Sequence, residues 1–328
     1  MKNNLRWHPA TVRAHRDLTP TVREFEIRPE GGVKPWTVGS HLDVQVRVQG
    51  REETRSYSLV GLPHGPGAAE VYRIAVRRAD PGRGGSRFLW CLETGAELAI
   101  GEPNNHFELA FGAPSFLLVA GGIGITPILG MALQLAERGA ALRLCFAARS
   151  HDEMAYAGML RAALGDRLRT FAGDRGERLD LDAEIAALPP GGQLWICGPL
   201  SLLDAAREAW ARSGRPRADL RFETFGNSGR FEATPFWVEL PRHGLRLEVP
   251  AERSLLDVLN EAGVDILSDC KRGECGLCAI DILRVEGTVD HRDVFFSAHE
   301  KQASQRLCAC VSRVNGGGAV LDSAWRAD

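Results

Sequence analysis

Five of the eight cysteines in this 328-residue chain lie between Cys270 and Cys310. Cys270, Cys275 and Cys278 stand in the sequence DCKRGECGLC. Three thiolates in one tight loop, completed by a distant fourth cysteine, are the ligand arrangement of a plant-type 2Fe–2S cluster. The two glycines of this loop allow the positive φ and the close backbone approach that it requires. We therefore predict a 2Fe–2S cluster here.

Two cysteines, Cys308 and Cys310, are candidates for the fourth ligand. A zinc site would more commonly pair two Cys-x2-Cys knuckles or add histidines at ligand spacing. The region has His291 and His299 but no second knuckle. The spacing therefore favours the cluster over zinc.

The rest of the composition narrows the cellular setting. The other cysteines are scattered, and the first residues, MKNNLRWHPATVR, lack an apolar stretch. We therefore expect a cytoplasmic protein without a secretory signal or a disulfide scaffold. A formal net charge of −2 argues against nucleic acid or an anionic membrane as the main partner.

One segment is long enough and apolar enough to suggest a membrane helix. No charged side chain occurs from Leu109 to Ala136. Gly121, Gly122, Gly124, Gly130 and Pro127 interrupt it, which is typical of a buried strand, loop and helix. We therefore predict no membrane span.

The pattern of apolar residues indicates three domains. Short strands separated by turn residues predict an N-terminal antiparallel β-barrel over residues 1–108, with strands at Val22–Ile27, Leu42–Val48, Tyr57–Val60 and Val71–Val76. Strand and helix then alternate over residues 109–227, which predicts an α/β domain with a parallel sheet. After a linker at Gly226–Thr234, strands and a helix are expected around the cysteine loop over residues 235–328. This last segment resembles plant-type ferredoxins, which implies an α+β ferredoxin-like (β-grasp) domain.

Within the α/β domain the expected elements follow the apolar periodicity. The predicted strands are Phe116–Ala120, Leu142–Ala147 and Leu194–Cys197, and the predicted helices are Pro127–Arg138, Met154–Leu164, Asp182–Leu188 and Leu200–Ser213. Thr126 is the expected N-cap of the first helix, with Gly139 just beyond its end. In the last domain we predict strands Phe236–Glu239, Leu245–Val249 and Ala319–Leu321 and the helix Leu255–Ala262.

Two glycine-containing segments suggest phosphate binding. The sequence AGGIGITP, residues 120–127, links a strand to a helix start, where free N–H groups attract phosphate. It is not the G-x-G-x-x-G fingerprint, so another type of nucleotide fold is expected. The loop GRGGSR, residues 82–87, combines three glycines, two arginines and a hydroxyl, which also suits a phosphate.

The order of the motifs carries a resemblance to a known family. RSYSL (55–59), GRGGS (82–86), EPNNHF (102–107), AGGIGITP (120–127) and CGP (197–199) follow one another along the chain. In this order they resemble the ferredoxin–NAD(P) reductase superfamily, and the C-terminal cysteine loop narrows the resemblance to the phthalate dioxygenase reductase family.

The resemblance implies an NADH-dependent reductase that contains FMN and a 2Fe–2S cluster. It implies flavin contacts by Arg55, Tyr57, Ser58, Gly84, Gly85, Ser86 and Arg87. It implies pyridine-nucleotide contacts by Gly122, Gly124, Thr126, Cys197 and Pro199, and an aromatic at Phe225 near the flavin. Phe225 is equally readable as a core residue. Arg149 would border the 2′ position and could accept NADPH or stack on adenine, and Asp174 is a further candidate.

The resemblance also bears on the fourth ligand and on the partner. The turn Gly287–Asp290 and the segment after Cys310 match the ferredoxin pattern and favour Cys310, whereas the raw distance from Cys278 favours Cys308. The implied acceptor is the terminal oxygenase of a Rieske non-haem iron system, and a monomer is implied. Charges at Lys271, Arg272 and Glu274 could form a docking rim, but solvated loop charges are the simpler interpretation.

Two alternatives remain open. The acceptor could be a haem monooxygenase or another carrier. Alternatively, the chain could be a non-enzymatic cluster-binding sensor or scaffold, against which the intact glycine segments argue.

Overall fold

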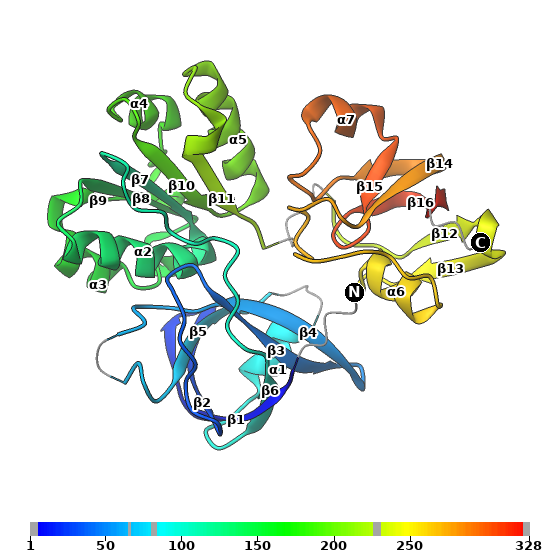
Figure 1. Ribbon diagram of the computed structural model, residues 1–328, viewed down its shortest axis with the longest axis horizontal. Coiled ribbons are helices and arrows are strands. Elements are labelled where there is room, and N and C mark those ends of the chain that lie inside the picture. The colour runs from blue at the N-terminus through cyan, green and yellow to red at the C-terminus, as the bar shows by residue number, and fades with distance from the viewer. Residues whose placement is uncertain (1–5, 65–66, 80–83, 226–230, 324–328) are drawn as a thin grey trace. The chain divides into compact units, whose positions relative to one another are not determined.

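Residues 6–64, 67–79, 84–225 and 231–323 are described by a computed structural model of the chain (Figure 1). The chain divides into two compact units, Asn4–Glu223 and Thr224–Asp328. The first unit contains an antiparallel and a parallel sheet, and the second contains one mixed sheet. This confirms the predicted fold class, while the three domain ranges stay predictions.

The N-terminal sheet is antiparallel, with strand order β4-β3-β6-β1-β2-β5. Its elements are β1 (His8–Thr19), β2 (Val22–Pro29), β3 (His41–Val48), β4 (Arg51–Ser58), β5 (Tyr72–Arg77), α1 (Gly85–Trp90) and β6 (Glu97–Ile100). Alternation along β3 buries Leu42, Val44 and Val46 in one core. The edge strands β4 and β5 meet at a bridge between Leu59 and Ile74, which makes the sheet an incompletely closed barrel.

The second sheet is parallel, with strand order β11-β10-β7-β8-β9. Its elements are β7 (Phe116–Gly121), η1 (Gly122–Gly124), α2 (Ile125–Glu137), β8 (Leu142–Ala148), α3 (Ala157–Leu164), β9 (Leu168–Ala172), α4 (Leu181–Ala186), β10 (Gln193–Cys197), α5 (Leu200–Arg212) and β11 (Leu220–Glu223). Helices α2 and α3 pack together on one face, and α4 and α5 on the other (Figure 1). The strand order reverses between β7 and β10, which is where open α/β sheets bind ligands.

Two predicted helix starts in this sheet are wrong. Helix α2 begins at Ile125, because the 3-10 turn η1 runs directly into it and Gly124 takes the N-cap position. Thr126 is therefore inside the helix, where its hydroxyl donates to Ile123 O at 3.0 Å. Helix α3 begins at Ala157 instead of Met154, since Tyr156 has a positive φ of 65°.

The uncharged segment from Leu109 is a buried strand, turn and helix, as predicted. Strand β7 is buried along its whole length, and most of α2 is buried as well. Among the residues that the structure describes, no helix has the length and apolarity needed to cross a membrane. Gly139, with a φ of 66°, follows the C-terminus of α2 as expected.

The C-terminal unit has strand order β13-β12-β16-β14-β15. Its elements are β12 (Phe236–Leu240), β13 (Leu245–Val249), α6 (Leu255–Glu261), β14 (Ala279–Asp290), α7 (Ala298–Ala303), β15 (Arg306–Cys308) and β16 (Arg313–Asp322). Ser254 caps α6 by accepting the Asp257 N–H at 3.1 Å. The cysteine loop lies between α6 and β14, and Cys308 ends β15 opposite Ala279. Residues 226–230 of the predicted linker are outside the described residues.

Candidate functional site

The predicted flavin residues come from β4 and from the start of α1. A Cβ on Gly85 would lie 2.7 Å from Arg55 Cγ, so the Arg55 side chain passes directly over this glycine. Gly84 has a φ of 81°, which favours glycine, and its missing side chain makes room for a valine of β3. The structure therefore brings Arg55, Gly84 and Gly85 together. Gly82 and Arg83 of the same loop lie outside the described residues.

The polar groups around Arg55 orient its guanidinium. Arg55 Nη1 donates to Thr54 O at 2.9 Å, and Nη2 is 2.5 Å from Glu53 Oε2. Ser86 Oγ accepts the Ala79 N–H at 3.1 Å, while Arg87 is exposed. An exposed arginine at a glycine turn suits a phosphate that reaches the site from solvent.

The end of β4 leads toward the second sheet. Ser58 is buried, and the next residue, Leu59, pairs with Ile74 of β5. Strand β5 in turn contacts η1, the turn after β7. A Cβ on Gly130 of α2 would lie 2.3 Å from Gly61 O, so only a glycine allows this approach. The predicted flavin strand and the predicted nucleotide turn therefore adjoin within one unit.

Glycines join the ends of β7 and β10 at the point where the strand order reverses. A Cβ on Gly124 would lie 2.2 Å from Cys197 O, and one on Gly121 would lie 2.7 Å from Pro199 Cδ. Gly122 has a φ of 54° and open space beside it. Because both strands are parallel, their carboxyl ends share one edge of the sheet. This edge is where a nucleotide binds in open α/β folds.

The predicted nucleotide residues differ in exposure along this edge. Cys197 and Thr126 are buried, whereas Pro199 and Arg149 are exposed. Arg149 follows β8, and its carbonyl accepts the Asp174 N–H at 2.8 Å. The loops after β8 and β9 therefore lie together, with Arg149 available on the outside.

Backbone N–H groups of the cysteine loop surround the sulfur of Cys270. The N–H groups of Arg272, Glu274 and Cys275 donate to Cys270 Sγ at 3.4, 3.3 and 3.4 Å. Burial and the Cys275 thiol raise the pKa of Cys270, and these three donors oppose that rise. N–H groups that converge on a thiolate are the environment of an iron–sulfur ligand.

Two glycines allow the loop to fold this tightly. Gly273 has a φ of 78°, and its Cβ would lie 2.8 Å from the Cα of Asp293. Gly276 has a φ of 73°, and its Cβ would lie 2.3 Å from the ring of Phe295. Neither position accepts a side chain, which matches the sequence prediction.

The remaining thiols gather around Cys278. Hydrogen bonds from Cys308 and Cys310 lower the pKa of the Cys278 thiol, and the same bonds, with burial, raise the pKa of the other two. The Gly273 N–H also reaches Cys310 and opposes the rise there. Cys310 therefore touches both the cysteine loop and Cys278. Five thiols therefore lie in this region, one more than a 2Fe–2S cluster needs.

A two-iron cluster distributes its four thiolates in pairs. Among the described residues, no three His, Cys, Asp or Glu side chains converge as ligands of a single metal ion.

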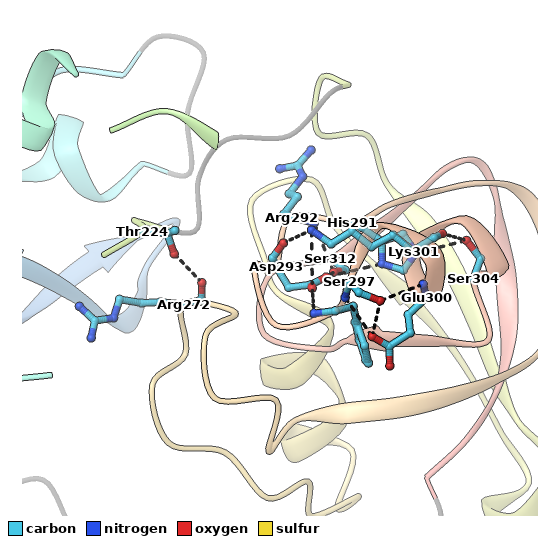
Figure 2. Close-up of polar contacts among 11 residues, drawn as sticks. Thr224, Arg272, His291, Arg292, Asp293, Ser297, Glu300, Lys301, Ser304 and Ser312 are labelled. Carbon is cyan, nitrogen blue, oxygen red and sulfur yellow. Dashed lines mark hydrogen bonds and ion pairs between the residues drawn. The ribbon is translucent and has the colours of Figure 1, made fainter. Parts of the chain in front are cut away.

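Glu274 and Arg272 are not the solvated charges that the sequence suggested. Their side chains are only 17% and 9% exposed, and Arg272 Nη2 lies 3.6 Å from Glu274 Oε2. Glu274 Oε1 accepts the Thr224 N–H at 2.7 Å. The Thr224 hydroxyl donates to Arg272 O at 3.0 Å, as Figure 2 shows. Lys271 is exposed. Phe225 is half-buried, and its predicted place beside the flavin stays a prediction.

Sequence reasoning missed a buried polar network behind the cysteine loop. Asp293 is fully buried and is surrounded by polar partners, as Figure 2 shows. These are His291, Phe296, Lys301 and Ser312. Burial raises the pKa of Asp293, but the His291 hydrogen bond, the Phe296 N–H and the Lys301 charge outweigh it and leave the pKa lowered. No periodic pattern marks such residues, because Asp293 and most of its partners lie in loops, with only Lys301 on α7.

Comparison with known proteins agrees with this architecture. Residues 238–315 match the model of the 2Fe-2S iron-sulfur cluster binding domain. The chain is 40% identical to the "Heme-dependent oxidative N-demethylase beta subunit" of Ectopseudomonas mendocina (strain ymp), over 95% of this chain and 97% of the relative. It is 35% identical to phthalate dioxygenase reductase of Burkholderia cepacia, over 95% and 96% of the two chains.

A solved structure gives the same result. It is a phthalate dioxygenase reductase, described as a modular structure for electron transfer from pyridine nucleotides to [2Fe–2S]. It matches with a TM-score of 0.77 and 33% identity, over 96% of this chain and 98% of that chain. The predicted family is therefore confirmed. The chain belongs to the phthalate dioxygenase reductase family, whose members are electron-transfer oxidoreductases that use FMN, NADH and a 2Fe–2S cluster.

Proposed function

We propose that this chain is the reductase component of an oxygenase system, which takes a hydride from NADH and delivers single electrons to a terminal oxygenase. Bound flavin supplies the conversion between two-electron and one-electron transfer, which a nicotinamide does not provide readily. The protein's own contribution is binding, orientation and electrostatics. The observation that carries the proposal is the convergence of backbone N–H groups on Cys270, in a chain where β5 contacts both β4 and η1.

For the flavin, we assign Arg55, Tyr57 and Ser58 to the ring side of the site. Gly84, Gly85, Ser86 and Arg87 are assigned to its phosphate. The crossing of Arg55 over Gly85 supports this, since one cation then serves both segments. Phe225 is proposed as an aromatic neighbour of the flavin.

For NADH, we assign Gly122, Gly124 and Thr126 after β7, and Cys197 and Pro199 after β10. The glycine contacts between these strand ends support a site at this edge. Arg149 is proposed to contact the adenosine portion from the exposed side of the edge. A single arginine there is compatible with stacking on adenine.

For the cluster, we assign Cys270, Cys275, Cys278 and Cys310 as ligands. The Gly273 N–H that reaches Cys310 supports this choice over Cys308. The assignment predicts that Cys308→Ser keeps the cluster and Cys310→Ser loses it or changes its electron paramagnetic resonance signal. The opposite result would make Cys308 the fourth ligand.

We propose that the partner is the terminal oxygenase of a Rieske non-haem iron system, as the family resemblance implies. A haem-containing oxygenase is the second candidate. It is favoured by the relative at 40% identity, which is named as the beta subunit of a heme-dependent oxidative N-demethylase. We further propose that the chain is a cytoplasmic monomer.

The test is an anaerobic titration of the purified protein with NADH. We expect flavin bleaching together with the rhombic signal of one reduced 2Fe–2S cluster per chain. Bleaching without that signal would contradict electron delivery through the cluster. Addition of a purified Rieske or haem oxygenase to the reduced protein then separates the two candidates, because only the true acceptor reoxidises it rapidly.

A further inference from the structure

Asp293 connects the cysteine loop to the segment that follows Cys310. The N–H of Val294, the residue after Asp293, donates to Gly273 O at 2.9 Å. This bond fixes the cysteine loop against the Asp293 segment. The Ser312 hydroxyl donates to Asp293 Oδ1 at 3.3 Å. Ser312 lies two residues after Cys310, so the Asp293 region holds both the loop and the segment leading from Cys310.

The Asp293 carboxylate is a buried charge with specific partners. Its exposed fraction is 0%, and Oδ2 accepts the Phe296 N–H at 2.9 Å. His291 Nδ1 lies 3.5 Å from Oδ1, and Lys301 Nζ lies 3.8 Å from Oδ2. Lys301 also donates to the Asp293 carbonyl and remains 21% exposed. A buried carboxylate without such partners would be strongly destabilising.

The position of Asp293 and Lys301 matters because charges beside the cysteine loop are weakly screened by water. The space next to Gly273 is filled by Asp293 itself, at 2.8 Å from the position that a Cβ would take. Buried charges interact over longer distances than exposed ones, since water and salt screen them less. A cluster that gains one electron on reduction senses nearby charge of either sign.

We propose that Asp293 is a positioning residue for the cluster: it holds the loop at Gly273 against the segment after Cys310 and, with Lys301, sets the reduction potential of the cluster. The proposal rests on the proposed function only in requiring that the cluster is present. The carboxylate disfavours the added electron and the ammonium favours it. Loss of either charge therefore shifts the potential, and the two shifts have opposite signs.

The experiment is redox potentiometry of the full-length holoprotein, followed by electron paramagnetic resonance. Asp293→Asn keeps the size of the side chain and removes its charge, so the midpoint potential should rise. Lys301→Gln should lower it. Asp281→Asn, which changes an exposed aspartate of β14, is the control and should leave the potential unchanged. Shifts of the same sign in the first two variants, or shifts no larger than in the control, would overturn the proposal.

The geometric part has a separate readout. Ser312→Ala removes the link to Asp293 without changing charge, so the g-values of the reduced cluster should change. Unchanged g-values in this variant would contradict the positioning role. If Asp293→Asn fails to hold a cluster, Lys301→Gln still tests the electrostatic part, since Asp293 keeps its other donors. Reduction by dithionite reveals the cluster without NADH, so failure of NADH reduction would count against the proposed function alone.

Discussion

The hydroxyl of Tyr156 offers a sharp test of how the first unit is held together. Tyr156 precedes α3, and its hydroxyl donates to Glu24 Oε2 of β2 at 2.7 Å. Glu24 is only 5% exposed, and its other oxygen accepts from Arg16 Nε at 2.7 Å. Burial and the Glu24 charge raise the pKa of Tyr156, so the phenol stays protonated and remains a donor. This bond joins the barrel to the parallel sheet's helices.

The substitution Tyr156→Phe removes the donor and keeps the ring. A hydrogen bond to a charged group contributes about 1.5–3 kcal/mol, and its loss leaves a buried carboxylate oxygen with one donor fewer. For a unit of this size, each kcal/mol lost from the free energy of unfolding lowers the thermal unfolding midpoint by about 2–4 °C. The expected decrease in the thermal unfolding midpoint is therefore about 3–12 °C.

The matched control is Tyr72→Phe in the barrel. Tyr72 is also buried, but its hydroxyl accepts the Lys34 N–H at 2.7 Å, a neutral hydrogen bond. Such a bond contributes only about 1 kcal/mol. Flavin release on heating reports on the first unit, and loss of cluster absorbance reports on the second. A decrease in Tyr156→Phe no larger than in Tyr72→Phe would refute the argument.

Three further predictions concern other sites. Gly124→Ala would place a Cβ 2.2 Å from Cys197 O, so the KM for NADH should rise about tenfold or more while flavin stays bound. The control is Gly158→Ala, which has open space around it and should leave the KM unchanged in the same steady-state assay. Native Cys145 is buried and its pKa is raised to about 12, mainly by burial, so mass spectrometry after iodoacetamide treatment should find exposed Cys91 alkylated and Cys145 not. Because Asp293 has a lowered pKa in the folded protein, its ionised form stabilises the fold above about pH 5, and this contribution is lost as the pH falls below about 4. The difference in unfolding midpoint between the natural protein and Asp293→Asn should therefore shrink toward pH 3, and a constant difference would contradict the assigned pKa direction.

The sequence predicts this fold well where a pattern repeats or a motif has fixed spacing. Alternation located the core strand β3, and apolar periodicity located β7, α2 and α5 to within a few residues. The strands β9 and β11 had no counterpart in the prediction. Both are short and carry exposed charged residues, such as Arg169 and Arg221, so their apolar signal is weak. Parallel pairing with β8 and β10 forms them, and that is not visible locally.

Capping was predicted less well than periodicity, and the reason is tertiary contact. Thr126 has the ideal chemistry of an N-cap, yet the close approach of Gly124 to Cys197 O fixes the preceding turn and starts α2 earlier. Tyr156 likewise delays the start of α3 from Met154 to Ala157, since its side chain reaches Glu24 on another sheet. Local propensity is worth only about 1 kcal/mol at such positions, so one buried contact is enough to override it.

The same reasoning explains which site residues the sequence could suggest. Cys270, Cys275 and Cys278 are spaced by the geometry of the cluster itself, so their pattern survives in the sequence. Asp293 has no fixed spacing to them, because it acts through Gly273 and Ser312 after the chain has folded back. A ligand must be near the metal in any fold of the family, whereas a charge that tunes it can approach from any direction. Residues that tune the metal by their charge are therefore found from their burial and their polar partners. The opposite shifts in reduction potential expected for Asp293→Asn and Lys301→Gln test whether these two residues are of that kind.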